Sequence, residues 1–437
     1  IENFKSEEYW KITAQCEHSK STFDARLTHF QGTKLQQFSI NQEPLATEAC
    51  TQILHHTQGK LTVLHIEKKE RLQRPAPPFI TSTLQQEASR KLGFTARKTM
   101  TVAQQLYEGV KTSTGTQGLI TYMRTDSVNM SMEALQAMRS YIHTHFGDAY
   151  CPEKPRFYQT KSKNAQEAHE AIRPTTASIT PEQVAAYLTP DQLKLYALIW
   201  KRALASQMTD AVLDTVAVDL SQHPSHQFRA NGATLRFKGF LSVYEEGKDD
   251  ALDDSAEMPL PPLEKGDVVA LKALKPSQHF TQPPPRFTEA TLVKALEEYD
   301  IGRPSTYASI IHTLQQREYA TLEKKRFAPT DVGRIVNRFL TQHFPSYVDY
   351  DFTASLENTL DAIARGEQAW IPILEQFWAP FIHQIKHVED NVQRKEVTTE
   401  ALETLCHKCN KPLVIRLGKR GRFIACTGYP DCDYTQA

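Results

Sequence analysis

Four cysteines near the C-terminus constrain this chain more than any other feature. Two of them are separated by two residues, and after sixteen more residues a second pair is separated by five: Cys406, Cys409, Cys426 and Cys432. Four thiolates satisfy the tetrahedral preference of Zn²⁺, and the close first pair is typical of a zinc knuckle. Residues 411–424 between the pairs favour a β-hairpin that turns at 418–421. We therefore predict a zinc ribbon with four cysteine ligands over 400–437, a unit so small that it needs the metal to fold.

Composition sets wide limits on the rest of the chain. Its 437 residues are enough for two to four domains, and no stretch approaches about 18 uncharged apolar residues, so we predict no transmembrane helix. Basic and acidic side chains number 51 each, which excludes a globally basic nucleic-acid binder but allows locally basic surfaces. The odd total of seven cysteines favours a reducing compartment, and we interpret Cys16, Cys50 and Cys151 as ordinary thiols.

The hydrophobic pattern changes along the chain. Alternation within residues 1–75 predicts short strands, and similar alternation returns at 211–280. Between these regions apolar residues recur at helical spacing, and one long helix is expected over 183–208. The pattern is helical again after residue 281. This order predicts an α+β multidomain protein in which a helical domain is inserted into a β domain.

A tyrosine and an arginine follow a short apolar stretch at Tyr122 and Arg124. Thr125 and Asp126 come next and are suited to cap a helix. A tyrosine hydroxyl can attack phosphorus and form a phosphotyrosine, and a neighbouring guanidinium can hold the phosphate and stabilise its charge. By themselves these residues are also compatible with a packed tyrosine beside an exposed arginine.

Two further motifs suit phosphate binding. His169 and Arg173 are four residues apart, so on a helix they would share one face, although such a pair is also common on ordinary surfaces. Residues 301–308 contain Arg303 and lead into a predicted helix through Ser305 and Thr306. The amide groups at that helix start can bind an anion, and Arg317 lies three turns further on, but the same residues could be an ordinary helix cap.

The predicted ribbon has a basic surface. Its six cations are Lys408, Lys411, Arg416, Lys419, Arg420 and Arg422. Phe423, Tyr429 and Tyr434 could stack on bases beside them, or they could cover the small core of the ribbon.

Taken together, these blocks resemble the bacterial type IA DNA topoisomerases. The resemblance covers nearly the whole chain and rests on seven segments: 78–86, 118–127, 168–174, 285–290, 301–308, 352–361 and the ribbon. It implies that Tyr122 attacks one DNA strand and keeps the 5′ phosphate, and that Arg124 neutralises this phosphate. Relaxation of negative supercoils then needs no ATP, in agreement with the lack of a Walker loop in the sequence.

The same resemblance implies roles for the other motifs. Thr125 and Asp126 would help to shape the site, and His169 and Arg173 would support it and contact DNA. Positions lining the path of the single strand are matched by Arg303, Ser305, Thr306 and Arg317.

A toroidal architecture is also implied by the resemblance. A β arch would comprise 1–82 and 211–280, the tyrosine would sit in an inserted helical domain over 83–210, and a helical DNA-groove domain over 281–395 would precede the ribbon. The family also carries a Toprim domain with Mg²⁺ ligands, which nothing here resembles. We therefore expect a truncated chain that binds single-stranded DNA and does not relax plasmid without a Toprim partner.

Two other functions stay open on the sequence. One is a non-catalytic single-stranded DNA-binding module, and the other is a decatenase of the topoisomerase III type, which Met123 and the ribbon disfavour. The family further implies a monomer that acts on DNA in the bacterial cytoplasm at the nucleoid, without a membrane, and that contacts RNA polymerase through its C-terminal region.

Overall fold

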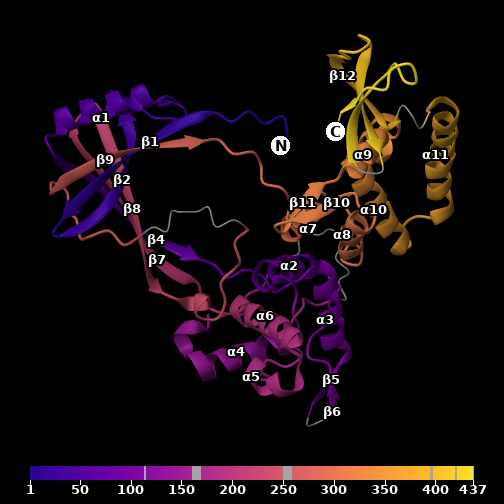
Figure 1. The fold of residues 1–437 in the computed structure, drawn as a ribbon. Coiled ribbons are helices and arrows are strands. Elements are labelled where there is room, and N and C mark those ends of the chain that lie inside the picture. The colour runs from indigo at the N-terminus through magenta and orange to yellow at the C-terminus, as the bar shows by residue number, and fades with distance from the viewer. Residues whose placement is uncertain (113–114, 160–168, 250–257, 394–396, 419–420, 437) are drawn as a thin grey trace. The chain divides into compact units, whose positions relative to one another are not determined.

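The computed structural model describes residues 1–437 except 113–114, 160–168, 250–257, 394–396, 419–420 and 437. The chain divides into two compact units built from alternating segments (Figure 1). The first unit comprises 1–77, 132–156 and 201–285, and the second unit comprises 78–131, 157–200 and 286–437. None of the described helices is both long and apolar enough to cross a bilayer.

A seven-stranded antiparallel sheet dominates the first unit. Its strands are β1 (Glu8–His18), β2 (Ser21–Phe30), β3 (Thr33–Lys34), β4 (Lys60–Gln73), β7 (Ala211–His223), β8 (His226–Phe237) and β9 (Val268–Phe280). Their order is β1-β9-β4-β7-β8-β2-β3, and β1 also pairs with β2. This additional pairing closes the sheet on itself, which removes two exposed edges.

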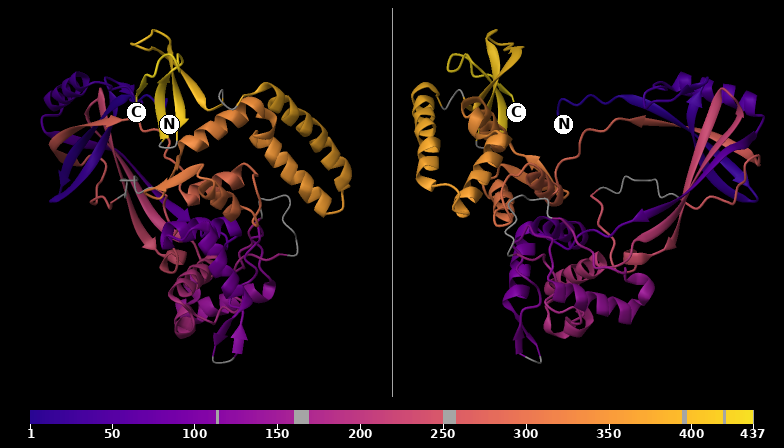
Figure 2. Two further views of the ribbon diagram at one scale, coloured as in Figure 1. Left: turned by 45° about the vertical axis from the view of Figure 1, so that its right-hand side comes forward. Right: turned by 180° about the vertical axis from the view of Figure 1, so that it is seen from behind.

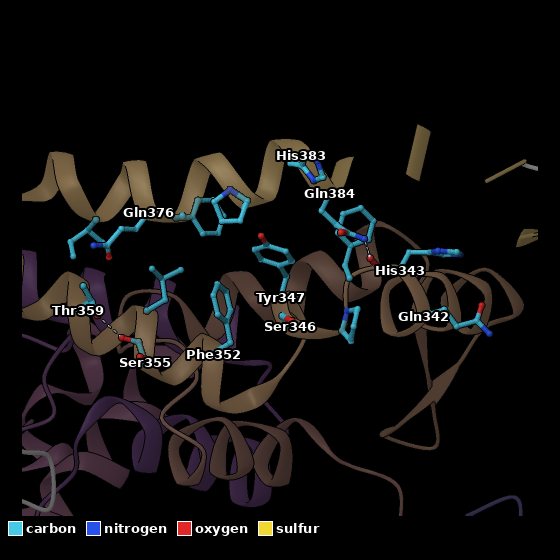
Figure 3. A pocket seen from close by; sticks show the side chains of 16 residues that line it. Gln342, His343, Ser346, Tyr347, Phe352, Ser355, Thr359, Gln376, His383 and Gln384 are labelled. Atoms are coloured by element: carbon cyan, nitrogen blue, oxygen red, sulfur yellow. Dashed lines mark hydrogen bonds between the residues drawn. The ribbon is translucent and has the colours of Figure 1, made fainter. Parts of the chain in front are cut away.

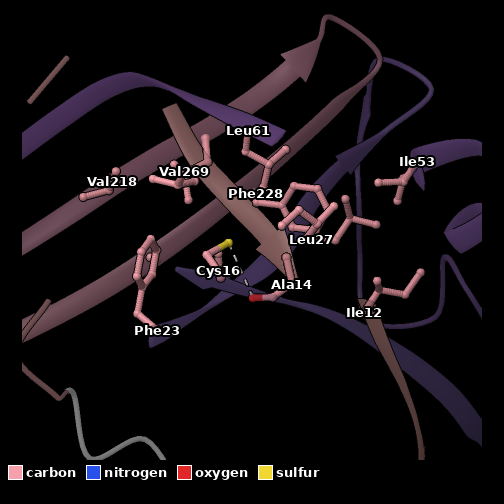
Figure 4. Close-up of a cluster of buried hydrophobic side chains, with 14 of the residues drawn as sticks. Ile12, Ala14, Cys16, Phe23, Leu27, Ile53, Leu61, Val218, Phe228 and Val269 are labelled. Atoms are coloured by element: carbon pink, nitrogen blue, oxygen red, sulfur yellow. Dashed lines mark hydrogen bonds between the residues drawn. The ribbon is translucent and has the colours of Figure 1, made fainter. Parts of the chain in front are cut away.

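The interior of this closed sheet is apolar (Figure 4). Along β1 the residues Ile12, Ala14 and Cys16 alternate inward, as a half-buried strand requires. Phe228 of β8 is fully buried among the same side chains. Burial, assisted by the charge of Asp24, raises the pKa of Cys16 to about 12, which disfavours its reactive thiolate form.

The strands extend well beyond this core. β4 and β7 pair continuously as far as Gln73 and Ala211, and most side chains of β4 after His65 are partly or fully exposed. In every view of Figures 1 and 2 the paired ends of β4 and β7 extend together beyond the closed part of the sheet. The predicted strands are therefore present, and several are longer than expected.

One helix in this region was not predicted. α1 (Glu43–Thr57) lies where the alternation suggested strands, and its buried residues Ala46, Ala49 and Ile53 recur at helical spacing. That spacing is the signal that could have found it. The first unit also holds α4 (Met132–Phe146) and two short 3₁₀ turns, Asp148–Tyr150 and Gly239–Ser242.

The second unit is mainly helical. Its N-terminal elements are α2 (Thr81–Glu87), a π-helical turn (Ala88–Leu92), α3 (Ala96–Glu108), β5 (Val110–Thr112), β6 (Gly115–Gln117), α5 (Pro181–Val184), a 3₁₀ turn (Ala185–Tyr187) and α6 (Pro190–Ser206). The residues of α6 from Lys201 onward belong to the first unit. The prediction of a single helix over 183–208 is therefore wrong. Thr189 and Gln192 form a reciprocal cap that starts α6 afresh at Pro190.

The remaining elements follow the predicted helical pattern. They are α7 (Glu289–Glu298), α8 (Tyr307–Gln316), β10 (Ala320–Glu323), β11 (Arg326–Pro329), α9 (Asp331–His343), a 3₁₀ turn (Pro345–Tyr347), α10 (Tyr350–Ala364), α11 (Trp370–Asn391) and the strands β12 (Thr399–Leu405), β13 (Pro412–Gly418), β14 (Gly421–Cys426) and β15 (Thr435–Gln436). The small hairpin β10–β11 was not predicted. Ala96 of α3 packs with Val293, Tyr307 and Ile311, so residues far apart in the sequence share one core.

Candidate functional site

The loop that carries Tyr122 is anchored by apolar side chains on both sides. Leu119, Ile120 and Met123 are almost completely buried, whereas Tyr122 is half-buried and Arg124 is exposed. The loop is therefore held by its apolar residues while the two predicted catalytic side chains remain at least partly accessible. This arrangement needs no regular helix or strand at Tyr122.

Thr81 at the start of α2 fastens the same loop. Its hydroxyl donates to the carbonyl oxygens of Met123 (2.8 Å) and Thr125 (3.0 Å), and it accepts from the Thr125 amide (2.9 Å). The Thr81 amide in turn donates to the Thr125 carbonyl at 2.9 Å. Both residues are buried, so these hydrogen bonds form away from competing water.

The segment after residue 168 is extended, which corrects the helical interpretation of His169 and Arg173. Ile172 and Pro174 form antiparallel bridges with Phe79 and Ile120. The Thr121 amide donates to the Arg173 carbonyl (2.9 Å), and the Thr121 hydroxyl accepts from the Arg173 amide (3.0 Å). These long-range backbone bonds replace the local bonds of a helix, and residues 160–168 before them are outside the described part.

The extended segment nevertheless brings His169 to Tyr122. Their ring centroids are 6.0 Å apart, and the ring of Tyr107, at the end of α3, meets Tyr122 edge-on at 5.3 Å. The Tyr122 ring is thus flanked by two aromatic rings from different elements. Such contacts restrict the orientation of a side chain that has to present its hydroxyl in one direction.

Arg173 is engaged by a carboxylate beside it. Its Nε donates to the Glu170 carboxylate at 2.6 Å, and a terminal nitrogen lies 2.5 Å from the same oxygen. The Arg173 side chain is largely buried, whereas Arg124 is exposed and stands closer to Tyr122 in the sequence. In this structure Arg124 is therefore the more accessible of the two cations.

The 301–308 motif forms the start of α8, as predicted. The Thr306 hydroxyl accepts from the Arg303 amide at 2.8 Å, and Gly302 adopts a positive φ of 78°. Arg303 donates from Nε (3.0 Å) and from a terminal nitrogen (2.9 Å) to the carboxylate of Asp361 on α10. Ser305 is exposed, and Arg317 is exposed at the C-terminal end of α8.

The Tyr122 loop and the start of α8 are close together within the second unit. Burial raises the pKa of Tyr307 above its usual range, and the charges of Glu297 and Asp126 raise it further while Arg303 opposes them. Asp126 therefore lies near enough to Tyr307 for its charge to be felt. The Ala96 amide also donates to Glu289 at 2.6 Å, which joins α3 to α7.

The four C-terminal cysteines lie together in the predicted ribbon. Their sulfur atoms are all within 4.8 Å of one another, with Cys409 and Cys426 3.2 Å apart and Cys406 and Cys432 3.7 Å apart. Burial opposes ionisation of Cys406, but the amides of Lys408 and Cys409 and the thiols of its neighbours lower its pKa to about 7. Four convergent sulfurs, one of them readily ionised, fit a tetrahedral zinc ion.

The hairpin between the cysteine pairs is also as predicted, with Gly418 opposite Gly421. Its aromatic residues differ in exposure: Tyr429 is 69% exposed, Phe423 is half-buried, and Tyr434 packs on the ribbon core and on His407. Tyr429 is therefore the aromatic side chain most available for stacking. The predicted cations Lys419 and Arg420 are outside the described residues.

A pocket of about 770 Å³ lies elsewhere in the second unit, between α10 and α11. Tyr347, Phe352 and Phe377 contact one another there, and His383 stands at its edge (Figure 3). None of the predicted site residues lines it. The pocket is therefore separate from the Tyr122 loop.

Two family models match this chain. The model described as DNA topoisomerase matches residues 1–375, and the model described as topoisomerase DNA binding C4 zinc finger matches 403–437. This chain belongs to the bacterial type IA DNA topoisomerase family. The second match and the clustered cysteines together support zinc as the metal of this topoisomerase ribbon.

Similar proteins named DNA topoisomerase 1 support the same family assignment. DNA topoisomerase 1 of Xylella fastidiosa (strain Temecula1) is 52% identical over 97% of this chain and 52% of its own length. The Rickettsia conorii enzyme of the same name is 48% identical over the whole chain and 58% of its own length. Full-length topoisomerase I from Thermotoga maritima superposes with a TM-score of 0.79 at 32% identity, covering the whole chain and 67% of that structure. The topoisomerase chain thus spans little more than half of these curated relatives.

Three residues around the candidate site were not singled out from the sequence. Thr81, Tyr107 and Glu170 contact the Tyr122 loop or Arg173. Thr81 and Tyr107 are distant from Tyr122 along the chain, so no local pattern could have paired them. Glu170 lies three residues before Arg173, and that opposite-charge spacing was a usable signal.

Proposed function

We propose that this chain provides the tyrosine side of ATP-independent relaxation of negatively supercoiled DNA. The observation that carries the proposal is the setting of Tyr122, which is half-buried between Tyr107 and His169 on a loop fastened by Thr81. A preoriented hydroxyl beside an exposed arginine suits nucleophilic attack on a phosphodiester.

The proposed step is a transesterification. The Tyr122 Oη–H bond breaks and an Oη–P bond forms, while the bond between phosphorus and O3′ breaks. The proton lost by the tyrosine is balanced by one gained at O3′, which leaves a 3′ hydroxyl and a 5′-phosphotyrosine. Reversal after strand passage restores the DNA, and because the phosphotyrosine conserves the bond energy, ATP is not needed.

Arg124 is the proposed electrostatic partner of the phosphate. It is exposed, two residues from the nucleophile, and a guanidinium can bind two phosphate oxygens at once. Thr125 and Asp126 shape the loop behind it, and His169 restrains the tyrosine ring. The guanidinium of Arg173 is paired with Glu170. In this scheme Arg173 contacts DNA only when a phosphate displaces the Glu170 carboxylate.

The single strand is proposed to run past the start of α8. Ser305 is exposed there beside Thr306, whose hydroxyl holds the Arg303 amide, and Arg317 is exposed at the other end of α8. Arg303 reaches DNA by exchanging Asp361 for a phosphate. The exposed Tyr429 of the ribbon provides a stacking surface for unpaired bases. We also propose the four-part division into a β arch (1–82 and 211–280), a tyrosine domain (83–210), a groove domain (281–395) and the ribbon.

Magnesium has no evident ligands in the described part of this chain. The clusters of three or more potential ligands there are the four cysteines and a group of three histidines, and neither contains a carboxylate. Mg²⁺ prefers carboxylate and water oxygens. The described residues do not fit that ion, and no step is assigned to it; we propose that cleavage requires a separate acidic module of the Toprim type.

The test is adduct formation on end-labelled single-stranded DNA with Mg²⁺, with and without a separately expressed Toprim domain. We expect a covalent adduct at the new 5′ end of the cleaved strand only when the Toprim domain is present. Tyr122→Phe should abolish the adduct and keep DNA binding, whereas the matched control Tyr107→Phe should still form it. Binding without any adduct under all conditions would instead support a non-catalytic single-stranded DNA-binding module.

The DNA products of the reaction provide a second test of the proposal. Preferential decatenation of DNA with single-stranded regions, rather than relaxation of plasmid, would support a topoisomerase III-like activity. Plasmid relaxation by residues 1–437 without the Toprim domain would contradict the need for a second module.

A further inference from the structure

Three histidines from distant parts of the chain meet in the first unit. His56 lies in the last turn of α1, and His223 and His226 flank the turn between β7 and β8. Their ligand nitrogens are all within 4.8 Å of one another. His56 Nδ1 is 2.8 Å from His226 Nε2, and the ring of His56 stacks on that of His223 at 4.4 Å between centroids.

Each ring has a nitrogen suited to the cluster. The Ser225 amide donates to Nδ1 of His223 at 3.2 Å, which leaves its Nε2 free for a ligand and fixes the ring. His226 is only 2% exposed, and the ring nitrogen that faces His56 is its Nε2.

The surroundings of His226 disfavour its charged form. Burial, followed by the nearby rings of His56 and His223, lowers the pKa of His226, while a hydrogen bond with the Ser225 backbone opposes this shift. His56 is exposed, and its ring stacks on both His223 and His226. Three imidazoles around a tetrahedral ion place their nitrogens roughly 3.4 Å apart, a spacing within the range already present.

We propose that His56, His223 and His226 form a second metal site, which binds one divalent first-row ion, Zn²⁺ in the first instance. Imidazole nitrogens suit Zn²⁺, Ni²⁺ and Cu²⁺, and three protein ligands leave one position for water on the side of the exposed His56. The ion joins the end of α1 to the β7–β8 turn. This site is independent of the ribbon and of DNA cleavage.

The test is zinc content of the full chain after equilibration with Zn²⁺ and removal of unbound ion. We expect about two zinc ions per chain, one in the ribbon and one at the histidines. His56→Gln and His223→Gln should each lower this to about one. The exposed histidine His65, which is outside the cluster, supplies the control His65→Gln, which should keep both ions.

Two further measurements separate this site from the ribbon. Cys409→Ser should lose the ribbon zinc and retain the histidine zinc. Added Zn²⁺ should raise the thermal unfolding midpoint of Cys409→Ser but not that of its double variant with His56→Gln. A wild-type chain with only the ribbon zinc, or a second zinc that survives both histidine variants, would overturn the proposal.

Discussion

Thr81 and Thr125 bind each other through side chain and backbone at once. The Thr125 amide donates to the Thr81 hydroxyl, and the Thr81 amide and hydroxyl both donate to the Thr125 carbonyl. The start of α2 is thereby joined to a loop more than forty residues away in the sequence. The position of Tyr122 depends on this contact because only two residues separate it from Thr125.

Thr81→Val tests this contact. The substitution preserves shape but removes the hydroxyl partner of the Met123 carbonyl and of the Thr125 amide, while the Thr81 amide still donates to the Thr125 carbonyl. We therefore expect a loss of about 1–3 kcal/mol in the free energy of unfolding. Adduct formation should fall more than DNA binding, because the nucleophile loses its orientation. Denaturant unfolding and the adduct assay measure the two effects. Thr101→Val, on the exposed face of α3, is the control that should change neither.

The ion pair between Arg303 and Asp361 predicts a substitution that strengthens DNA binding. If Arg303 binds phosphate, Asp361 competes with DNA, so Asp361→Asn should tighten single-stranded DNA binding about two- to fivefold, corresponding to roughly 0.5–1 kcal/mol. Fluorescence anisotropy at fixed salt measures this. Asp351→Asn, earlier on the same helix, removes an equal charge and should have a smaller effect. Weaker binding by Asp361→Asn would indicate that the pair only supports the fold.

Removal of zinc should unfold the ribbon alone. The ribbon core consists mainly of the cysteines and a few apolar residues, so it cannot persist without the metal. Cys409→Ser should reproduce the effect of chelation, while Cys50→Ser in the first unit should not. Circular dichroism with limited proteolysis checks this prediction, and a large loss of helical signal on chelation would contradict it.

The basic hairpin of the ribbon should contribute to the salt dependence of DNA binding. Replacing Lys419, Arg420 and Arg422 together by alanine should lower affinity and reduce the slope of log K against log salt by up to about 2, at roughly 0.7 per phosphate contact. Arg422 already pairs with Glu400 and lies 3.9 Å from Asp331. Of the three cations, it should therefore contribute least to the salt dependence of DNA binding.

A charge-matched variant controls for net charge. Lys20, Lys34 and Lys60 are exposed in the first unit, and their joint replacement by alanine removes three cations away from the ribbon. An equal change of slope in both triple variants would show that the ribbon has no specific role.

Several features were predictable because their signals are local. The cysteine spacing and the intervening glycines identified the ribbon, and helical periodicity located α7, α8 and α11 within a few residues. The α1 helix was missed because alternating strand segments lie on both sides of it, although Ala46, Ala49 and Ile53 recur at helical spacing. Tyr122 was singled out by resemblance to a family, since a tyrosine near an arginine is weak support by itself.

The sequence by itself determined which segments can be helix, strand or ribbon, because periodicity, caps and ligand spacing act over a few residues. Only the tertiary structure decided that residues 169–174 are extended, because their backbone groups bond to Phe79 and Thr121 rather than to one another. Long-range packing likewise brought His169 to Tyr122 and His56 to His226. Contacts between residues 47 and 170 positions apart depend on how the whole chain closes, and no local pattern encodes that.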